Sequence, residues 1–128
     1  MVNTVTVSID GMGGDYAPGM IVEDVELACQ KNKNIRFLIF GDANILQDLL
    51  TRHPKAQAVS EVRHAPDMIS MDDRPTTALR SGKNSSMRLA IDAVKNNEAS
   101  AVVSAGNTGA LMAMATIVLK MMPGISRP

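Results

Sequence analysis

Residues 104–109, Ser-Ala-Gly-Asn-Thr-Gly, have the composition of an anion-binding loop, and they separate a short apolar run from a long apolar segment. Gly106 and Gly109 carry no side chain that would keep a ligand away from the backbone. Asn107 or Thr108 can cap a following helix, whose first N–H groups and dipole favour an anion in front of them. The pattern predicts a site for a small oxyanion such as phosphate. Its structural alternative is an ordinary strand-to-helix turn.

A second glycine cluster spans residues 10–15, Asp-Gly-Met-Gly-Gly-Asp. Gly11 and Gly13 match the start of the G-x-G-x-x-G dinucleotide fingerprint, but Tyr16 occupies the third glycine position. Asp42, the next acidic residue after an expected strand, lies too far along the chain for the usual ribose contact. A dinucleotide site is therefore disfavoured.

The same cluster has a second interpretation, as a backbone surface that faces the Asn107 loop. Gly13 and Gly14 would form this surface, because neither has a side chain. Asp10 and Asp15 flank the cluster and are candidates for acid–base catalysis or for holding a cation. Capping and turn formation are commoner uses of aspartate at such positions.

Positive charge concentrates in one segment, at Arg74, Arg80, Lys83 and Arg88. These side chains can hold an anionic substrate, or they can form an ordinary solvated surface. Gly82-Lys83 resembles the end of a P-loop, but Asn84 stands where that motif requires Ser or Thr. A nucleoside-triphosphate site is not supported.

The sequence offers no activated nucleophile. Ser104 has only half of a nucleophile elbow, because Val102 occupies the first glycine position of that motif. Cys29 falls on the apolar stripe of an expected helix, and a single cysteine fits a reducing, cytoplasmic compartment better than a disulfide or CxxC metal site. His53 and His64 stand alone, without the spacing of metal ligands, so we expect no metal.

Strands and helices alternate along the sequence. Four apolar runs predict strands at residues 5–9, 35–40, 59–64 and 101–103, of which the third has the weakest pattern. Helical spacing predicts helices at residues 18–30, 43–52, 85–97 and 107–122, and an exposed loop is expected at 67–75. The alternation predicts an α/β fold with a mostly parallel sheet, in which both glycine loops follow the carboxyl ends of strands, where ligands bind.

The composition is that of an ordinary globular domain. Of the 128 residues, 45% are hydrophobic and 20% are charged, which is close to average usage. Aromatic residues make up 2%, and 13 basic residues balance 13 acidic ones, so a nucleic-acid partner is not expected. The most apolar window, residues 110–119, is about half the length of a bilayer span. The N-terminus shows no signal-peptide pattern.

Three motifs, in this order and at this spacing, resemble the N-terminal part of the bacterial phosphate acyltransferases, the PlsX family: IDGMGGDYAP, RPTTALRSGKNSSMRLAIDAV and SAGNTGALMA. The resemblance implies transfer of a fatty acyl group from acyl carrier protein to inorganic phosphate, giving acyl phosphate for phospholipid synthesis. It also implies a three-layer α/β/α fold similar to that of isocitrate dehydrogenase and phosphotransacetylase. A homodimer that associates peripherally with the membrane is expected, without metal or organic cofactor.

In this chemistry phosphate is itself the nucleophile, so the absence of an activated Ser or Cys fits. From the residues and the resemblance together, we expect the phosphate cradle to be formed by Ser104, Gly106, Asn107, Thr108 and Gly109. We expect Gly13, Gly14 and Asp15 to form the facing wall, and Arg74, Arg80 and Lys83 to add positive charge for phosphate or for the acidic carrier protein. Asn107 and Asp10 are the candidate catalytic residues.

Members of this family run well beyond 128 residues. We therefore expect residues 1–128 to be the N-terminal part of a single acyltransferase domain, incomplete as a fold and with little activity alone. One alternative is a coenzyme A-dependent phosphate acetyl- or butyryltransferase on a related fold. The other is a non-catalytic anion-binding module.

Overall fold

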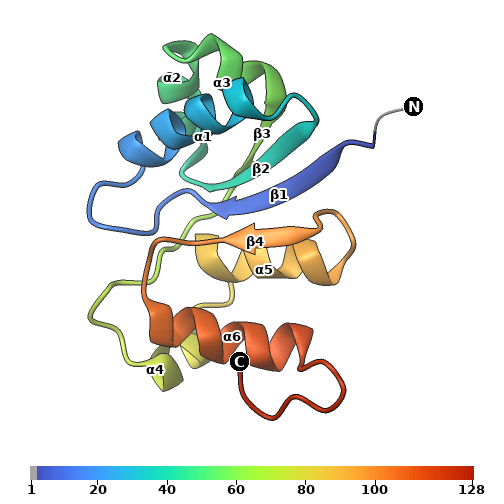
Figure 1. The fold of residues 1–128 in the computed structure, drawn as a ribbon. Coiled ribbons are helices and arrows are strands. Elements are labelled where there is room, and N and C mark those ends of the chain that lie inside the picture. The colour runs from blue at the N-terminus through green and yellow to red at the C-terminus, as the bar shows by residue number, and fades with distance from the viewer. Residues whose placement is uncertain (1–2) are drawn as a thin grey trace.

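Four parallel strands form the sheet, in the spatial order β3-β2-β1-β4 (Figure 1). The computed structural model describes residues 3–128. The strands are β1 (Val5–Asp10), β2 (Ile35–Gly41), β3 (Ser60–His64) and β4 (Ala101–Val103). In the register of β1 and β4, Ile9 lies opposite Val103, so the two glycine loops leave the sheet side by side.

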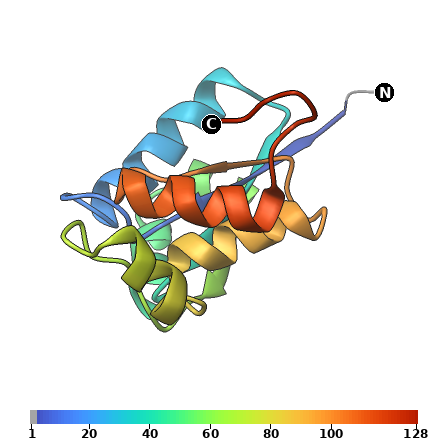
Figure 2. The same cartoon turned by 90° about the horizontal axis from the view of Figure 1, so that it is seen from below.

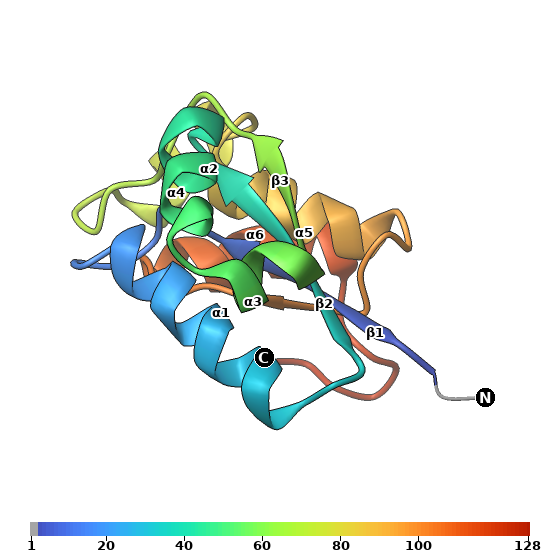
Figure 3. The same ribbon diagram turned by 90° about the horizontal axis from the view of Figure 1, so that it is seen from above.

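Helices cover both faces of this sheet. They are α1 (Gly19–Lys31), α2 (Ala43–Thr51), α3 (Pro54–Val59), α4 (Pro75–Ser81), α5 (Ser86–Lys95) and α6 (Thr108–Leu119). Helices α1, α2 and α3 lie on one face, as Figures 1 and 3 show, and α5 packs on the other face against β1, β2 and β4. Helices α6 and α4 lie beyond α5 (Figure 2). This arrangement confirms the predicted three-layer α/β/α fold with a parallel sheet.

The core has apolar clusters on both faces of the sheet. Strand β2 is buried along Phe37–Gly41, as expected for a strand covered by helices on each side. Ile39 and Leu46 belong to the cluster under α1 to α3, while Leu38 and Phe40 of β2 pack with Ala90 and Ala93 of α5 on the other face. A further cluster between α4, α5 and α6 includes Met87 and Met114. The continuous apolar run in β2 thus reflects two packed faces.

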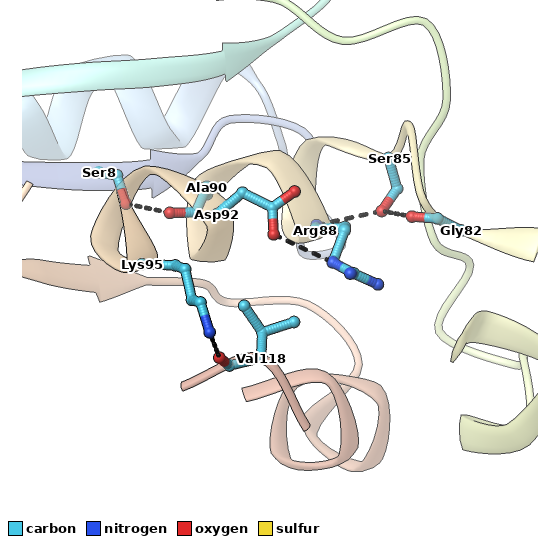
Figure 4. Close-up of polar contacts among 8 residues, drawn as sticks. All are labelled: Ser8, Gly82, Ser85, Arg88, Ala90, Asp92, Lys95 and Val118. Carbon is cyan, nitrogen blue, oxygen red and sulfur yellow. Dashed lines mark hydrogen bonds and ion pairs between the residues drawn. The ribbon is translucent and has the colours of Figure 1, made fainter. Parts of the chain in front are cut away.

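Polar contacts fix α5 between the sheet and α6, as Figure 4 shows. The hydroxyl of Ser8 on β1 donates to the carbonyl of Ala90 at 2.6 Å. At the C-terminal end of α5, Lys95 Nζ donates to the carbonyl of Val118 at 3.1 Å, which satisfies an acceptor in the last turn of α6. Helix α5 therefore links the strand that precedes one glycine loop to the helix that follows the other.

Two short helices were not predicted. Pro54 and Pro75 occupy the first turns of α3 and α4, where the missing N–H costs nothing, and each helix is too short to show an apolar period. Helix α6 ends at Leu119, three residues earlier than expected, because Lys120 adopts a positive φ of 66°. Among the helices of residues 3–128, none has the length and apolar character needed to span a bilayer.

Candidate anion site at the carboxyl ends of β1 and β4

The two glycine loops meet backbone to backbone. A Cβ atom placed on Gly13 would lie 3.0 Å from the backbone nitrogen of Gly106, and one placed on Gly106 would lie 3.2 Å from the Cα atom of Gly13. Gly14 has a φ of +108°, and a Cβ there would lie 3.2 Å from the carbonyl oxygen of Ala105. Any side chain at Gly13 or Gly106 would therefore push the loops apart.

The Asp10 carboxylate lies next to Gly13 and is buried, since Asp10 is 2% exposed. Its Oδ1 accepts hydrogen bonds from the Ser86 hydroxyl at 2.5 Å and from the Met12 N–H at 3.2 Å. Its Oδ2 accepts from the Ser104 hydroxyl at 2.9 Å. A buried carboxylate needs such donors, and these join β1, the start of α5 and the loop after β4. Asp10 is the shared anchor of both loops.

Ser104 connects the Asp10 carboxylate to the backbone of the second glycine loop. Its hydroxyl donates to Asp10 and accepts from the N–H of Gly106 at 3.1 Å. The contact between Ser86 and Asp10 was missed by the sequence analysis, because the two residues are 76 positions apart and no spacing rule joins them. The only signal was the position of Ser86 at the start of an expected helix.

Asn107 is buried and caps α6. Its Oδ1 accepts from the Ala110 N–H at 3.1 Å, and its Nδ2 donates to the carbonyls of Asp73 at 2.7 Å and Ser70 at 3.1 Å. One side chain thus satisfies an N–H of the first turn and fastens the loop at 70–73 to the start of the helix. Both ends of the Asn107 amide are engaged by the protein.

Two N–H groups in the first turn of α6 have no hydrogen-bond partner within residues 3–128. The N–H groups of Gly106 and Ala110 donate to side chains, whereas those of Thr108 and Gly109 have no partner within residues 3–128. Thr108 is exposed, and a Cβ on Gly109 would lie 3.0 Å from Cγ of Pro75. The N–H groups of Thr108 and Gly109 are thus left without a partner in the described part of the chain, and Gly109 lies beside Pro75 at the start of α4.

The basic residues of the prediction are spread along α4. Arg74 directly precedes Pro75, the residue that approaches Gly109. Arg80 lies in the last turn of α4, and Lys83 follows Gly82, which approaches Met114 in the middle of α6. All three side chains are exposed, and none takes part in an ion pair within residues 3–128. The neighbours of Arg74, Asp73 and Pro75, contact the start of α6, whereas Gly82, next to Lys83, approaches the middle of α6.

Asp15 is exposed on the outer side of the first loop. It lines a cavity of 150 Å³ together with Gly13, Gly14 and Ala105. Within residues 3–128 no three His, Cys, Asp or Glu side chains come together as metal ligands would.

A cluster of charged side chains away from the glycine loops is centred on Arg63 of β3, where hydrogen bonds to Glu61 and Glu98 raise the pKa of Arg63. Strand β2 separates it from β1.

Comparison with known proteins gives matches over nearly the whole chain. The sequence profile of a family described as "Fatty acid synthesis protein" matches residues 5–128. A phosphate acyltransferase of Rhodospirillum centenum is 53% identical over 122 residues, which cover 95% of this chain and 34% of that protein. One from Paramagnetospirillum magneticum is 50% identical over 124 residues, covering 97% and 35%. One from Parvibaculum lavamentivorans is 50% identical over 129 residues, covering 100% and 36%. The chain spans about a third of the length of the curated relatives it matches.

Proposed function

This chain belongs to the family of fatty acid synthesis proteins, and on that premise we propose that it supplies the phosphate-binding part of a phosphate acyltransferase. Residues 1–128 would then be the N-terminal part of a single α/β acyltransferase domain. The observation that supports this proposal best is the contact between the Gly13 and Gly106 loops, beside a helix start with two open N–H groups.

In the proposed reaction an oxygen of inorganic phosphate attacks the carbonyl carbon of an acyl thioester. The carbon–sulfur bond breaks, the acyl group passes to phosphate, and the thiolate leaves and takes up a proton. The protein then needs to orient phosphate beside the thioester and stabilise the developing oxyanion. It needs no nucleophile of its own, which agrees with the burial of Cys29 in the core.

The N–H groups of Thr108 and Gly109 would hold the phosphate, at the positive end of the α6 dipole. Arg74 would add positive charge from the start of α4. Asn107 and Asp10 would act as positioning residues, because their side chains are engaged by the protein: Asn107 sets the first turn of α6, and Asp10 orients Ser104. Gly13 and Gly14 would complete the facing wall.

Acyl carrier protein is the proposed acyl donor. The exposed side chains of Arg74, Arg80 and Lys83 offer positive charge to an acidic carrier protein. Homodimer formation, cytoplasmic location and peripheral association with the membrane stay predictions, and they rest on the resemblance.

Titration calorimetry with inorganic phosphate tests the proposal. We expect saturable binding to the chain that weakens at least tenfold in Asn107→Asp, which places a negative charge beside the open N–H groups. Potassium chloride at matched ionic strength is the control for screening. Binding that ignores the substitution, or no binding, would contradict the proposed phosphate site. Comparing acylated carrier protein with acyl coenzyme A in the same experiment distinguishes the two donors.

A further inference from the structure

Ser86, the first residue of α5, makes two separate contacts with segments that lead to the candidate phosphate site. Its hydroxyl donates to Oδ1 of Asp10 at 2.5 Å, at the end of β1. Its backbone N–H donates to the carbonyl of Asp67 at 2.9 Å, in the loop that leads to α4. A change of the Ser86 side chain therefore removes the contact with Asp10 and leaves the backbone contact available.

The contact with Asp10 continues as a series of hydrogen bonds to the loop before α6. Oδ2 of Asp10 accepts from the Ser104 hydroxyl at 2.9 Å, and the Ser104 oxygen accepts from the N–H of Gly106 at 3.1 Å. A carboxylate only accepts hydrogen bonds, so the single hydroxyl proton of Ser104 is directed to Asp10 and its lone pairs are left for Gly106. Rotation of the Asp10 carboxylate would break this arrangement, and the Ser86 hydroxyl opposes that rotation.

We propose that Ser86 is a positioning residue for phosphate. It fixes the Asp10 carboxylate and thereby the Gly106 peptide, which lies two residues before the open N–H group of Thr108. The inference rests on the proposed function, which assigns phosphate to the N–H groups of Thr108 and Gly109. Ser86 acts through Asp10, because it is 1% exposed and its hydroxyl proton is already engaged. Small displacements of the loop matter because hydrogen bonds weaken steeply with poor geometry.

Ser8 on β1 offers a matched control. Its hydroxyl also joins β1 to α5, by donating to the carbonyl of Ala90 at 2.6 Å (Figure 4). Ser8 is 0% exposed, so Ser8→Ala and Ser86→Ala each remove a buried hydroxyl between the same strand and the same helix. Of these two hydroxyls, only that of Ser86 contacts Asp10.

Calorimetry with inorganic phosphate compares the two variants, and thermal unfolding measures the loss of stability in each. We expect Ser86→Ala to weaken phosphate binding about three- to tenfold, and Ser8→Ala to weaken it less than about twofold at a similar loss of stability. Equal losses of affinity, or no loss in Ser86→Ala, would reduce Ser86 to a support for the packing of α5 and overturn the proposal.

A double-mutant cycle with Ser104→Ala tests the route of the effect. If Ser86 acts through Asp10 and Ser104, Ser86→Ala should weaken binding no further once Ser104 is alanine. Additive losses would contradict this route. Ser86→Cys places a weaker donor of similar shape at the same position, and the same predictions hold for it if the alanine variant does not fold.

Amide NMR spectra recorded without phosphate distinguish failure of this inference from failure of the proposed function. Ser86→Ala should shift the amide signals of Ser104 and Gly106, and Ser8→Ala should change them much less. Unchanged signals in Ser86→Ala would refute the positioning role, whether or not phosphate binds. Shifted signals in a protein whose parent does not bind phosphate would leave the control of this loop by Ser86 in place and refute the proposed phosphate site.

Discussion

Helices α2 and α6 both begin just after a parallel strand, yet they satisfy their first N–H groups differently. In α2, Asp42 accepts from the N–H groups of Asn44 at 3.0 Å and Ile45 at 3.3 Å, and Ala43 donates to Nδ1 of His64 at 3.2 Å. All three N–H groups of that first turn thus have side-chain partners. The helix carries its own anion, in the form of the Asp42 carboxylate.

In α6 the capping residue is the neutral Asn107, and it satisfies only the third of these N–H groups, that of Ala110. The amide nitrogen of Asn107 is directed instead to the loop at 70–73. The N–H groups of Thr108 and Gly109 and the dipole of α6 are left for an anion from outside. The difference between the two helix starts is the choice of Asp or Asn at the cap, together with the glycines that keep the backbone accessible.

The largest effect is expected from Asp10→Ala, because Asp10 anchors the loops before α1 and α6. Loss of the carboxylate leaves the hydroxyls of Ser86 and Ser104 without their acceptor, which should destabilise the protein by about 3 kcal/mol. Asp42→Ala removes a partly exposed cap and should cost only about 1 kcal/mol. Urea denaturation of both variants measures the difference, and equal losses would show that Asp10 is no anchor.

Exchange of the two caps comes next. Asn107→Asp should weaken phosphate binding at least tenfold, as above, and should also destabilise the protein by about 2 kcal/mol, because a carboxylate would face the carbonyls of Ser70 and Asp73. Asp42→Asn keeps an oxygen acceptor for α2 and should change stability by less than about 0.5 kcal/mol. Thermal unfolding and calorimetry of this pair show whether the cap alone distinguishes the two helix starts.

Gly13→Ala tests the close approach of the loops. The added methyl would lie 2.5 Å from Oδ2 of Asp10, so the loop has to move, at a cost of about 1–2 kcal/mol. Gly19→Ala is the matched control, since a Cβ there would meet nothing within 4 Å. Chemical denaturation should separate the two variants clearly. If Gly13→Ala were as stable as Gly19→Ala, the loops would not be in tight contact.

The smallest effect is expected at Arg74. Arg74→Ala should leave stability within about 0.5 kcal/mol of the parent and weaken phosphate binding about two- to fivefold, an effect that shrinks as salt increases. Arg52→Ala removes another exposed arginine, at the end of α2, and should leave phosphate binding unchanged. Calorimetry at two salt concentrations makes this comparison. Equal effects of the two substitutions would remove Arg74 from the site.

The fold could be predicted from the sequence where apolar pattern and turn chemistry agree. The run at 35–40 shows a strand covered on both faces, and Asn107 was one of two candidate caps before the structure distinguished them. Helices α3 and α4 were missed because they are too short to show a helical period.

Contacts between distant residues account for the rest of what was missed. The alternation of strands and helices predicted both loops at the carboxyl ends of the strands, but the bonds of Asp10 to Ser86 and of Asn107 to the loop at 70–73 depend on tertiary packing. For the same reason, the pattern of basic residues did not separate Arg74 from Arg80 and Lys83.

The proposed phosphate site depends most on the N–H groups of Thr108 and Gly109 in α6, and amide NMR spectra recorded during a phosphate titration observe them directly. We expect saturable shifts of the Thr108 and Gly109 amide signals, with little change for Asn44 and Ile45 in α2. Asn107→Asp should abolish the shifts. If the amide signals of Thr108 and Gly109 do not respond to phosphate, or if those of α2 respond equally, the distinction between the two helix starts and the proposed phosphate site are both wrong.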